Sequence, residues 1–167
     1  VWVEALRRLD EQPTLPHWQG VVVGEASGAD ARPGGFADEL RATVAREGLA
    51  HRVVFAGFRR DLATCLQAVD IACIPSEREA FGLSVIESMA ADCAVIGSAS
   101  GAIPELIDQD RGRVADPADP GAWTAAIAEL VADADLRVRL AAAGREWVNA
   151  RFTLAEHVER LVGYYRG

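Results

Sequence analysis

Two glutamates flank a glycine in the segment 75–90, and together the three residues could bind a phosphorylated ligand. Glu79 and Glu87 are separated by seven residues, with Gly82 between them. Glycine lets a bulky group approach the backbone, and the amides of Leu83 and Ser84 would be unpaired donors at a helix start. Helix N-termini bind anions through such N–H groups and the helix dipole. The segment therefore predicts a diphosphate site without a lysine-bearing phosphate loop.

The two carboxylates are placed to hold what is attached to a diphosphate. Glu87 follows Gly82 by five residues, which is about 7.5 Å along a helix, close to one step from pyrophosphate to ribose. We expect its carboxylate to accept hydrogen bonds from both ribose hydroxyls. Glu79 precedes the helix, so it should lie on the other side of the phosphates, where a sugar would be. The pattern favours a nucleoside diphosphate sugar as ligand.

Strands and helices are predicted to alternate around this segment. Apolar runs rich in β-branched residues predict strands at 18–24, 52–56, 70–74, 94–97 and 112–115. Helical periodicity predicts helices at 1–9, 36–47, 61–68, 82–91, 103–107, 123–131, 136–150 and 153–165, and 25–35 is predicted to be a loop. Parallel strands need right-handed crossovers. The predicted fold class is doubly wound α/β: a Rossmann-like parallel sheet with helices on both faces and extra C-terminal helices.

Two expectations concern the start of the chain. The valine-rich run at 18–24 is predicted to be a central parallel strand buried on both faces. The first nine residues already have the pattern of the middle of an amphipathic helix, with Val1, Ala5, Leu6 and Leu9 on one stripe. This suggests that the chain belongs to a longer parent protein.

Composition narrows the range of partners. The 167 residues suit one domain, and 17 Lys and Arg against 25 Asp and Glu give a net charge of −8, which disfavours nucleic acids and anionic membrane surfaces. The three cysteines form no Cys-x-x-Cys pair and favour a reducing cytoplasm, where each acts as a small apolar residue. The three histidines have no metal-ligand spacing, so no metal site is predicted.

Several short motifs together resemble the retaining glycosyltransferases of the GT-B fold, of the group 1 or family 4 type. The pair Glu79 and Glu87 encloses Phe81-Gly82-Leu83, as in that family. The other matching motifs are Val53-Val54-Phe55-Ala56-Gly57, Asp70 with Pro75-Ser76, Gly101 with Glu105, and Asp116-Pro117. The resemblance runs from Val21 to about Tyr165.

This resemblance implies an enzyme with two facing domains, of which residues 1–167 would be the C-terminal, nucleotide-sugar-binding domain. It would bind a UDP- or GDP-sugar donor and take part in retaining transfer of a hexosyl group, without a metal or other cofactor. The N-terminal acceptor domain would be absent, so the chain alone should be inactive. Polysaccharide biosynthesis in the cytoplasm is implied, with membrane contact only through the missing part, at the inner face of the membrane.

The resemblance also assigns roles to residues. Glu79 would be the catalytic-site residue that orients the donor sugar, and the backbone of Ala80, Phe81, Gly82 and Leu83 would contact the sugar and the distal phosphate. Glu87 would hold the ribose, and Gly57 with Phe58 would lie near the base.

Two positions depart from the family pattern around these residues. Asp92 stands where relatives usually have glycine; it tolerates a left-handed backbone, so the turn can survive. Gly101 is followed by Ala102 where relatives often have a second glycine, so the backbone approach to the donor could differ there.

Two other functions stay open at this point. A nucleotide-sugar epimerase domain can share the architecture and the ligand class, although the spacing of Glu79 and Glu87 favours a transferase. A non-catalytic binding module is the second alternative. Nucleotide binding distinguishes an active site from such a module.

Overall fold

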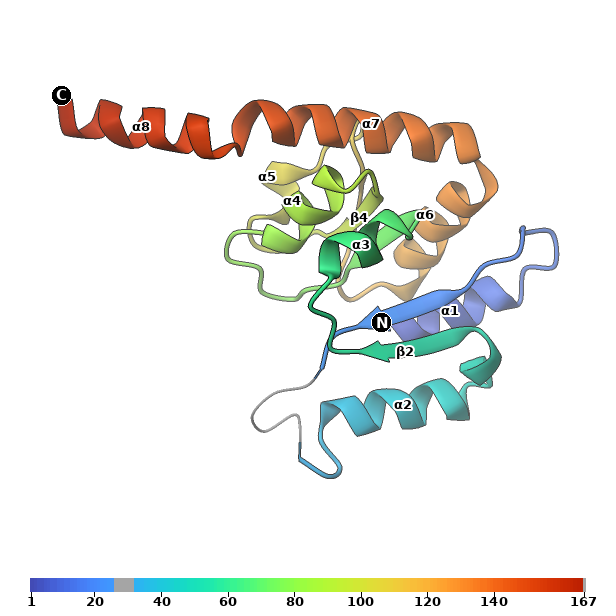
Figure 1. The fold of residues 1–167 in the computed structure, drawn as a ribbon. Helices are drawn as coiled ribbons and strands as arrows, with labels where there is room; N and C mark the ends of the chain where they lie inside the picture. The colour runs from blue at the N-terminus through green and yellow to red at the C-terminus, as the bar shows by residue number, and fades with distance from the viewer. Residues whose placement is uncertain (26–31, 167) are drawn as a thin grey trace.

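The computed structural model describes residues 1–25 and 32–166, in which five strands alternate with helices (Figure 1). The strands are β1 (Gly20–Val23), β2 (Val53–Gly57), β3 (Ile71–Ile74), β4 (Ala94–Ser98) and β5 (Arg113–Ala115). The helices are α1 (Trp2–Asp10), α2 (Phe36–Arg46), the 3-10 turn η2 (Leu49–His51), α3 (Leu62–Gln67), α4 (Leu83–Ala90), α5 (Ile103–Leu106), α6 (Pro120–Ala132), α7 (Ala134–Arg151) and α8 (Leu154–Arg166). The predicted order is confirmed, with η2 as an addition. Part of the predicted loop 25–35 lies outside the described residues.

The strands form two parallel groups. β1 pairs with β2, with Val22 opposite Phe55, and β4 lies between β3 and β5, with Ile96 opposite both Cys73 and Arg113. A helix intervenes between paired strands, as parallel pairing requires. The predicted α/β class with parallel strands and flanking helices is therefore confirmed.

The group β3–β5 separates two cores, because successive side chains of a strand point to opposite faces. All five residues of β4 are buried: Ala94 and Ile96 belong to a first core with α1 and α6, whereas Val95 belongs to a second core with α4 and α5. Helices thus cover both faces of this group, as predicted.

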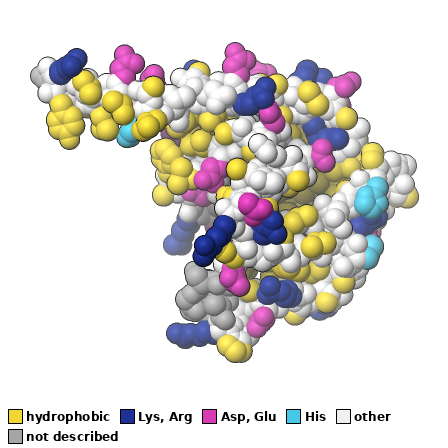
Figure 2. Space-filling model, in the orientation of Figure 1, with side chains coloured by type: hydrophobic (Ala, Val, Ile, Leu, Met, Phe, Trp, Pro, Cys, Tyr) yellow, Lys and Arg dark blue, Asp and Glu magenta, His cyan; other side chains and the backbone are white. Residues whose placement is uncertain are grey.

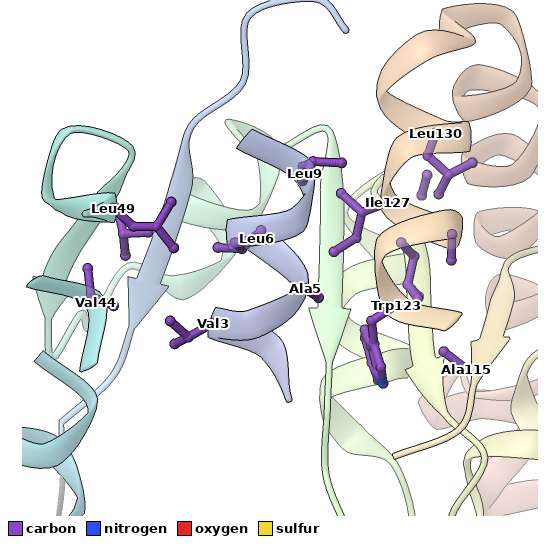
Figure 3. Close-up of a cluster of buried hydrophobic side chains, with 14 of the residues drawn as sticks. Val3, Ala5, Leu6, Leu9, Val44, Leu49, Ala115, Trp123, Ile127 and Leu130 are labelled. Carbon is purple, nitrogen blue, oxygen red and sulfur yellow. The ribbon is translucent and has the colours of Figure 1, made fainter. Parts of the chain in front are cut away.

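The first core is centred on two helices that lie side by side (Figure 3). Leu6 and Leu9 of α1 and Trp123 and Ile127 of α6 are buried there. The indole N–H of Trp123 donates to the carbonyl of Asp116 at 3.0 Å, so this large ring is buried without an unpaired donor. Trp123 is therefore a core residue.

The prediction of a central strand buried on both faces at 18–24 is wrong. β1 is only four residues long, and among the described residues it pairs with β2 alone. Val22 packs against the first core, but Val21 and Val23 are 44% and 36% exposed. Only one face of β1 and β2 is covered, which a run of valines cannot reveal, since it is equally compatible with burial on one face or two.

The C-terminal helices differ sharply in their packing. α7 packs on α4 and β4, and Gly144 lies so close to Met89 that an added Cβ would be 3.0 Å from its Cγ. By contrast, α8 has no buried residue and projects away from the rest of the chain (Figure 1). No helix in the described part of the chain is long and apolar enough to span a membrane.

Candidate functional site

A cavity of about 310 Å³ lies where β3 and β4 end. Its lining comes from the β3–α4 loop (75–82) and the β4–α5 loop (99–102), and consists of Glu77, Arg78, Glu79, Ala80, Ser100 and Gly101. Ligands of open α/β sheets bind beyond the carboxyl ends of the strands. A second cavity, of about 290 Å³, is lined by Asp70, Asp92 and Arg137 among others, at the start of β3, and contains none of the predicted site residues.

Hydrogen bonds hold the two loops against each other. The hydroxyl of Ser98 donates to the Ser76 carbonyl, and that of Ser100 donates to the Glu77 carbonyl. The amide of Ala102 donates to the Glu79 carbonyl at 3.0 Å.

Gly101 makes this close approach of the loops feasible. A Cβ at this position would lie 2.0 Å from the main-chain carbonyl oxygen of Glu79, and the backbone has a left-handed φ of 56°. Both features favour glycine. The position of Glu79 is thus fixed by backbone contacts with the neighbouring loop.

The carboxylate of Glu79 is oriented by its own loop. Its Oε1 accepts from the amide of Gly82 at 2.9 Å and from that of Phe81 at 3.4 Å. Its Oε2 makes no hydrogen bond to the described residues, and Glu79 lines the cavity. One oxygen therefore fixes the side chain, while the other can accept from a ligand.

Helix α4 begins three residues after Ala80, which lines the cavity. Gly82 is its N-cap, with a φ of 88°, and Leu106 lies so close that an added Cβ would be 2.4 Å from its Cδ1. Gly82 is itself buried, and its amide is already paired with Glu79. The first-turn amides of Leu83 and Ser84 have no acceptor within the helix, and both residues are exposed. The open crevice lies next to Gly82, at Glu79 and Ala80.

The structure brings only some of the predicted residues together. Glu79 and Ala80 line the cavity, and Phe81, Gly82 and Leu83 follow directly at the start of α4. Glu87 is exposed further along α4, outside the cavity lining. Gly57, with a φ of 67°, and the exposed Phe58 end β2, in the other strand group.

Two serines of the β4 end were not predicted as part of the site. Ser98 and Ser100 hold the β3–α4 loop, and Ser100 also lines the cavity. Their sequence signal is weak: they follow a strand at its carboxyl end, next to the strand that precedes Glu79.

Elsewhere in the described residues, the titratable groups with a shifted pKa are ion-paired or buried. After Phe58, Arg59 binds Asp61 through two hydrogen bonds of 2.9 and 2.7 Å, which hold the pKa of Asp61 below its usual value. Burial raises the pKa of the Cys93 thiol to about 11, and the thiol donates to the carbonyl of Leu66 at 3.1 Å. In residues 1–25 and 32–166 no three His, Cys, Asp or Glu side chains converge as metal ligands would.

Several known proteins are similar to this chain in sequence and fold. The chain is 34% identical to the lipopolysaccharide core biosynthesis mannosyltransferase LpcC of Rhizobium leguminosarum bv. viciae, over 99% of this chain and 46% of that protein. It is 31% identical to the C-terminal domain of a glycosyl transferase group 1 family protein, LpcC of Francisella tularensis, with a TM-score of 0.79 over 91% of this chain and 77% of that structure. Anabaena HepE in complex with UDP has the same fold, with 22% identity and a TM-score of 0.89 over 99% of this chain and 44% of that one.

The match extends over most of the sequence. The chain spans about half the length of the full-length relatives named above. The profile of the family described as "Glycosyl transferases group 1" matches residues 1–147 of the 167. Sequence, fold and relatives therefore agree that this chain belongs to the group 1 glycosyl transferases.

Proposed function

We propose that this chain binds the nucleoside diphosphate sugar donor of a retaining hexosyltransferase. The observation that carries the proposal is the cavity at the ends of β3 and β4, whose lining residue Ala80 precedes the first residue of α4 by three positions. Glu79, which has a carboxylate oxygen without a hydrogen bond to the described chain, lines this cavity, and the N-terminus of α4 follows it within four residues. This is the pairing that a sugar joined to a diphosphate would need.

The sugar is proposed to occupy the cavity next to Glu79. Oε1 of Glu79 is held by two amides, at 2.9 and 3.4 Å, so the side chain is oriented before a ligand arrives. Oε2 would accept from sugar hydroxyls. A preoriented acceptor loses little conformational entropy on binding, which favours affinity.

The diphosphate is proposed to lie over the first turn of α4. The amides of Leu83 and Ser84 are free of helical partners there, and the helix adds a partial positive charge at this end. In transfer, negative charge grows on the departing diphosphate while the sugar becomes oxocarbenium-like. Fixed donors that stabilise this charge would lower the barrier to transfer.

The nucleoside is proposed to extend away from the cavity. Glu87 is exposed on α4, about 7.5 Å along the helix from Gly82, and its carboxylate would accept from the ribose hydroxyls. Gly57 and Phe58, at the end of β2, would lie near the base. The bound UDP of the related fold makes uridine the first base to test.

The complete reaction would need more than this chain provides. We propose that a second, N-terminal domain binds the acceptor, because the full-length relatives are about twice as long as this chain. The isolated chain should then bind donor without transferring sugar, and no metal or other cofactor is proposed to take part. A place in envelope polysaccharide synthesis, on the cytoplasmic side of the membrane, is consistent with the lipopolysaccharide core enzyme among its relatives.

Calorimetry with UDP, GDP and ADP, and then with the corresponding sugar donors, tests the proposal. Replacing Glu87 with Ala should weaken nucleotide binding by about 1.5–3 kcal/mol, the range for a hydrogen bond to a charged group. Glu146→Ala is the matched control, since Glu146 is also an exposed helical glutamate but lies on α7.

The outcomes separate the proposal from its alternatives. A folded chain that binds no nucleoside diphosphate at millimolar concentration would instead be a non-catalytic module. Equal affinities of the Glu87 variant and wild type would remove the ribose role. Binding of UDP-glucose with no dependence on Glu79 would leave the sugar position without support.

A further inference from the structure

An aromatic side chain of the β3–α4 loop contacts the far C-terminal part of the chain. The ring of Phe81 meets that of Phe152 edge to face, with centroids 6.3 Å apart and an interplanar angle of 81°. Phe152 in turn packs on Trp147 of α7, at 5.3 Å. Phe81 is 53% exposed and Phe152 38% exposed, so each ring meets the other at the surface rather than inside a core.

A cation fixes the inner end of this aromatic group. The guanidinium of Arg111 stacks over the Trp147 ring at 4.4 Å and donates to the carbonyl of Leu106 at 2.9 Å. Leu106 is the residue whose side chain approaches Gly82 most closely. Phe152 therefore contacts Phe81, and Leu106 lies against Gly82. Arg111 and Trp147 connect these two contacts, because Arg111 binds Leu106 and stacks on Trp147, which packs on Phe152.

Phe152 occupies a turning point of the chain. It is the C-cap of α7, with its amide donating to the carbonyl of Val148 at 2.8 Å, and α8 begins at Leu154. α8 has no buried residue, and Leu161 is among its exposed apolar side chains. Figure 2 shows apolar side chains gathered along this helix. The Phe81–Phe152 contact thus joins the cavity loop to the junction of α7 and α8.

We propose that Phe152 is a positioning residue for the donor site, acting through Phe81. The amides of Phe81 and Gly82 hold the Glu79 carboxylate, so a displaced Phe81 ring would disturb the group that faces the cavity. The proposal rests on the proposed function for its ligand, a nucleoside diphosphate sugar. The geometric part, Phe152 restraining the β3–α4 loop, holds independently of any ligand.

Hydrogen exchange on the whole 167-residue chain tests the geometric part. An edge-to-face pair has an effect of about 2- to 12-fold on an equilibrium constant, so Phe152→Leu should speed exchange of the Phe81 and Gly82 amides by that factor. Phe81→Leu should have a similar effect, and the double variant no more than either single one. Phe152→Tyr keeps the ring and should restore slow exchange. Phe36→Leu, at an exposed ring on α2, is the matched control.

Donor affinity provides the second measurement. With UDP-glucose as probe, Phe152→Leu should raise the dissociation constant by about 2- to 12-fold, with little further change in the double variant. Unchanged exchange at Phe81 and Gly82 in folded Phe152→Leu, or additive effects of the two substitutions, would overturn the proposal. A wild-type chain that binds none of UDP, GDP, ADP and their sugar donors would refute the proposed function, while the exchange rates still decide for or against the Phe152 role.

Discussion

Replacing Gly101 with alanine should disturb the cavity, because it adds a methyl group where the β4–α5 loop touches the β3–α4 loop. Its φ of 56° is left-handed. The new Cβ would lie 2.0 Å from the carbonyl oxygen and 2.9 Å from the carbonyl carbon of the Glu79 main chain. These atoms belong to the backbone, so no side-chain rotation can relieve the clash. The β4–α5 loop would have to move away from the β3–α4 loop.

The expected cost follows from two effects. A left-handed backbone costs a residue with a Cβ about 1–2 kcal/mol. Separating the loops would also break the bond from the Ala102 amide to the Glu79 carbonyl, now 3.0 Å long, and a net hydrogen bond is worth about 0.5–1.5 kcal/mol. Together these give a loss of about 1.5–3.5 kcal/mol in the free energy of unfolding.

Urea unfolding followed by tryptophan fluorescence measures this loss, and calorimetry with UDP-glucose measures the accompanying loss of affinity. Gly48→Ala is the control, because Gly48 has a φ of 75° but no described atom within 4 Å of its added Cβ. It should show the backbone cost alone and leave affinity unchanged. The reasoning is refuted if Gly101→Ala is no less stable than Gly48→Ala and binds donor as wild type does.

Three further predictions concern stability and pH. Ser98→Ala should lower the free energy of unfolding by about 1–3 kcal/mol, because it leaves the Ser76 carbonyl without its buried donor, as urea titration would detect. Asp133→Ala should lower the free energy of unfolding by about 0.5–2 kcal/mol, because it removes the side-chain cap that accepts from the Leu136 amide at 2.8 Å. Asp133→Asn should keep most of this stability in the same titration. Burial, aided by two nearby carboxylates, raises the pKa of Cys93 to about 11 from a usual 9.0, and burial raises that of Cys73 to about 12. Stability measured against pH should therefore be intact below pH 9 and fall above it, and Cys93→Ala should reduce that slope but leave the part that comes from Cys73.

Local patterns predicted the order of the elements and several conformations. The buried strand β4 is a continuous run of apolar and small residues, and the amphipathic helix α1 has a helical periodicity. Both patterns can be recognised without knowledge of their neighbours. The left-handed residue expected at Asp92 is found, with a φ of 66°. Glu79 and Ala80 are found at a cavity because the carboxyl end of a parallel strand marks the site in this fold class.

Contacts between residues that are distant in the chain could not be predicted from the sequence. The hydroxyl bonds of Ser98 and Ser100 exist only because two loops meet, and nothing local distinguishes these serines from others in turns. The contact of Phe81 with Phe152 joins residues far apart in the chain. The exposure of Val21 depends on whether a second layer covers β1, which composition does not record.

The bonds between the two loops have a consequence for how substrate preference can change. All three are accepted by main-chain carbonyls, those of Ser76, Glu77 and Glu79, so the path of the loop does not depend on which side chains the accepting residues carry. Arg78 and Ala80 also face the cavity and take no part in these bonds. If the cavity binds a donor sugar as proposed, a library randomised at 77, 78 and 80 should alter which sugar is preferred while the path of the loop is kept.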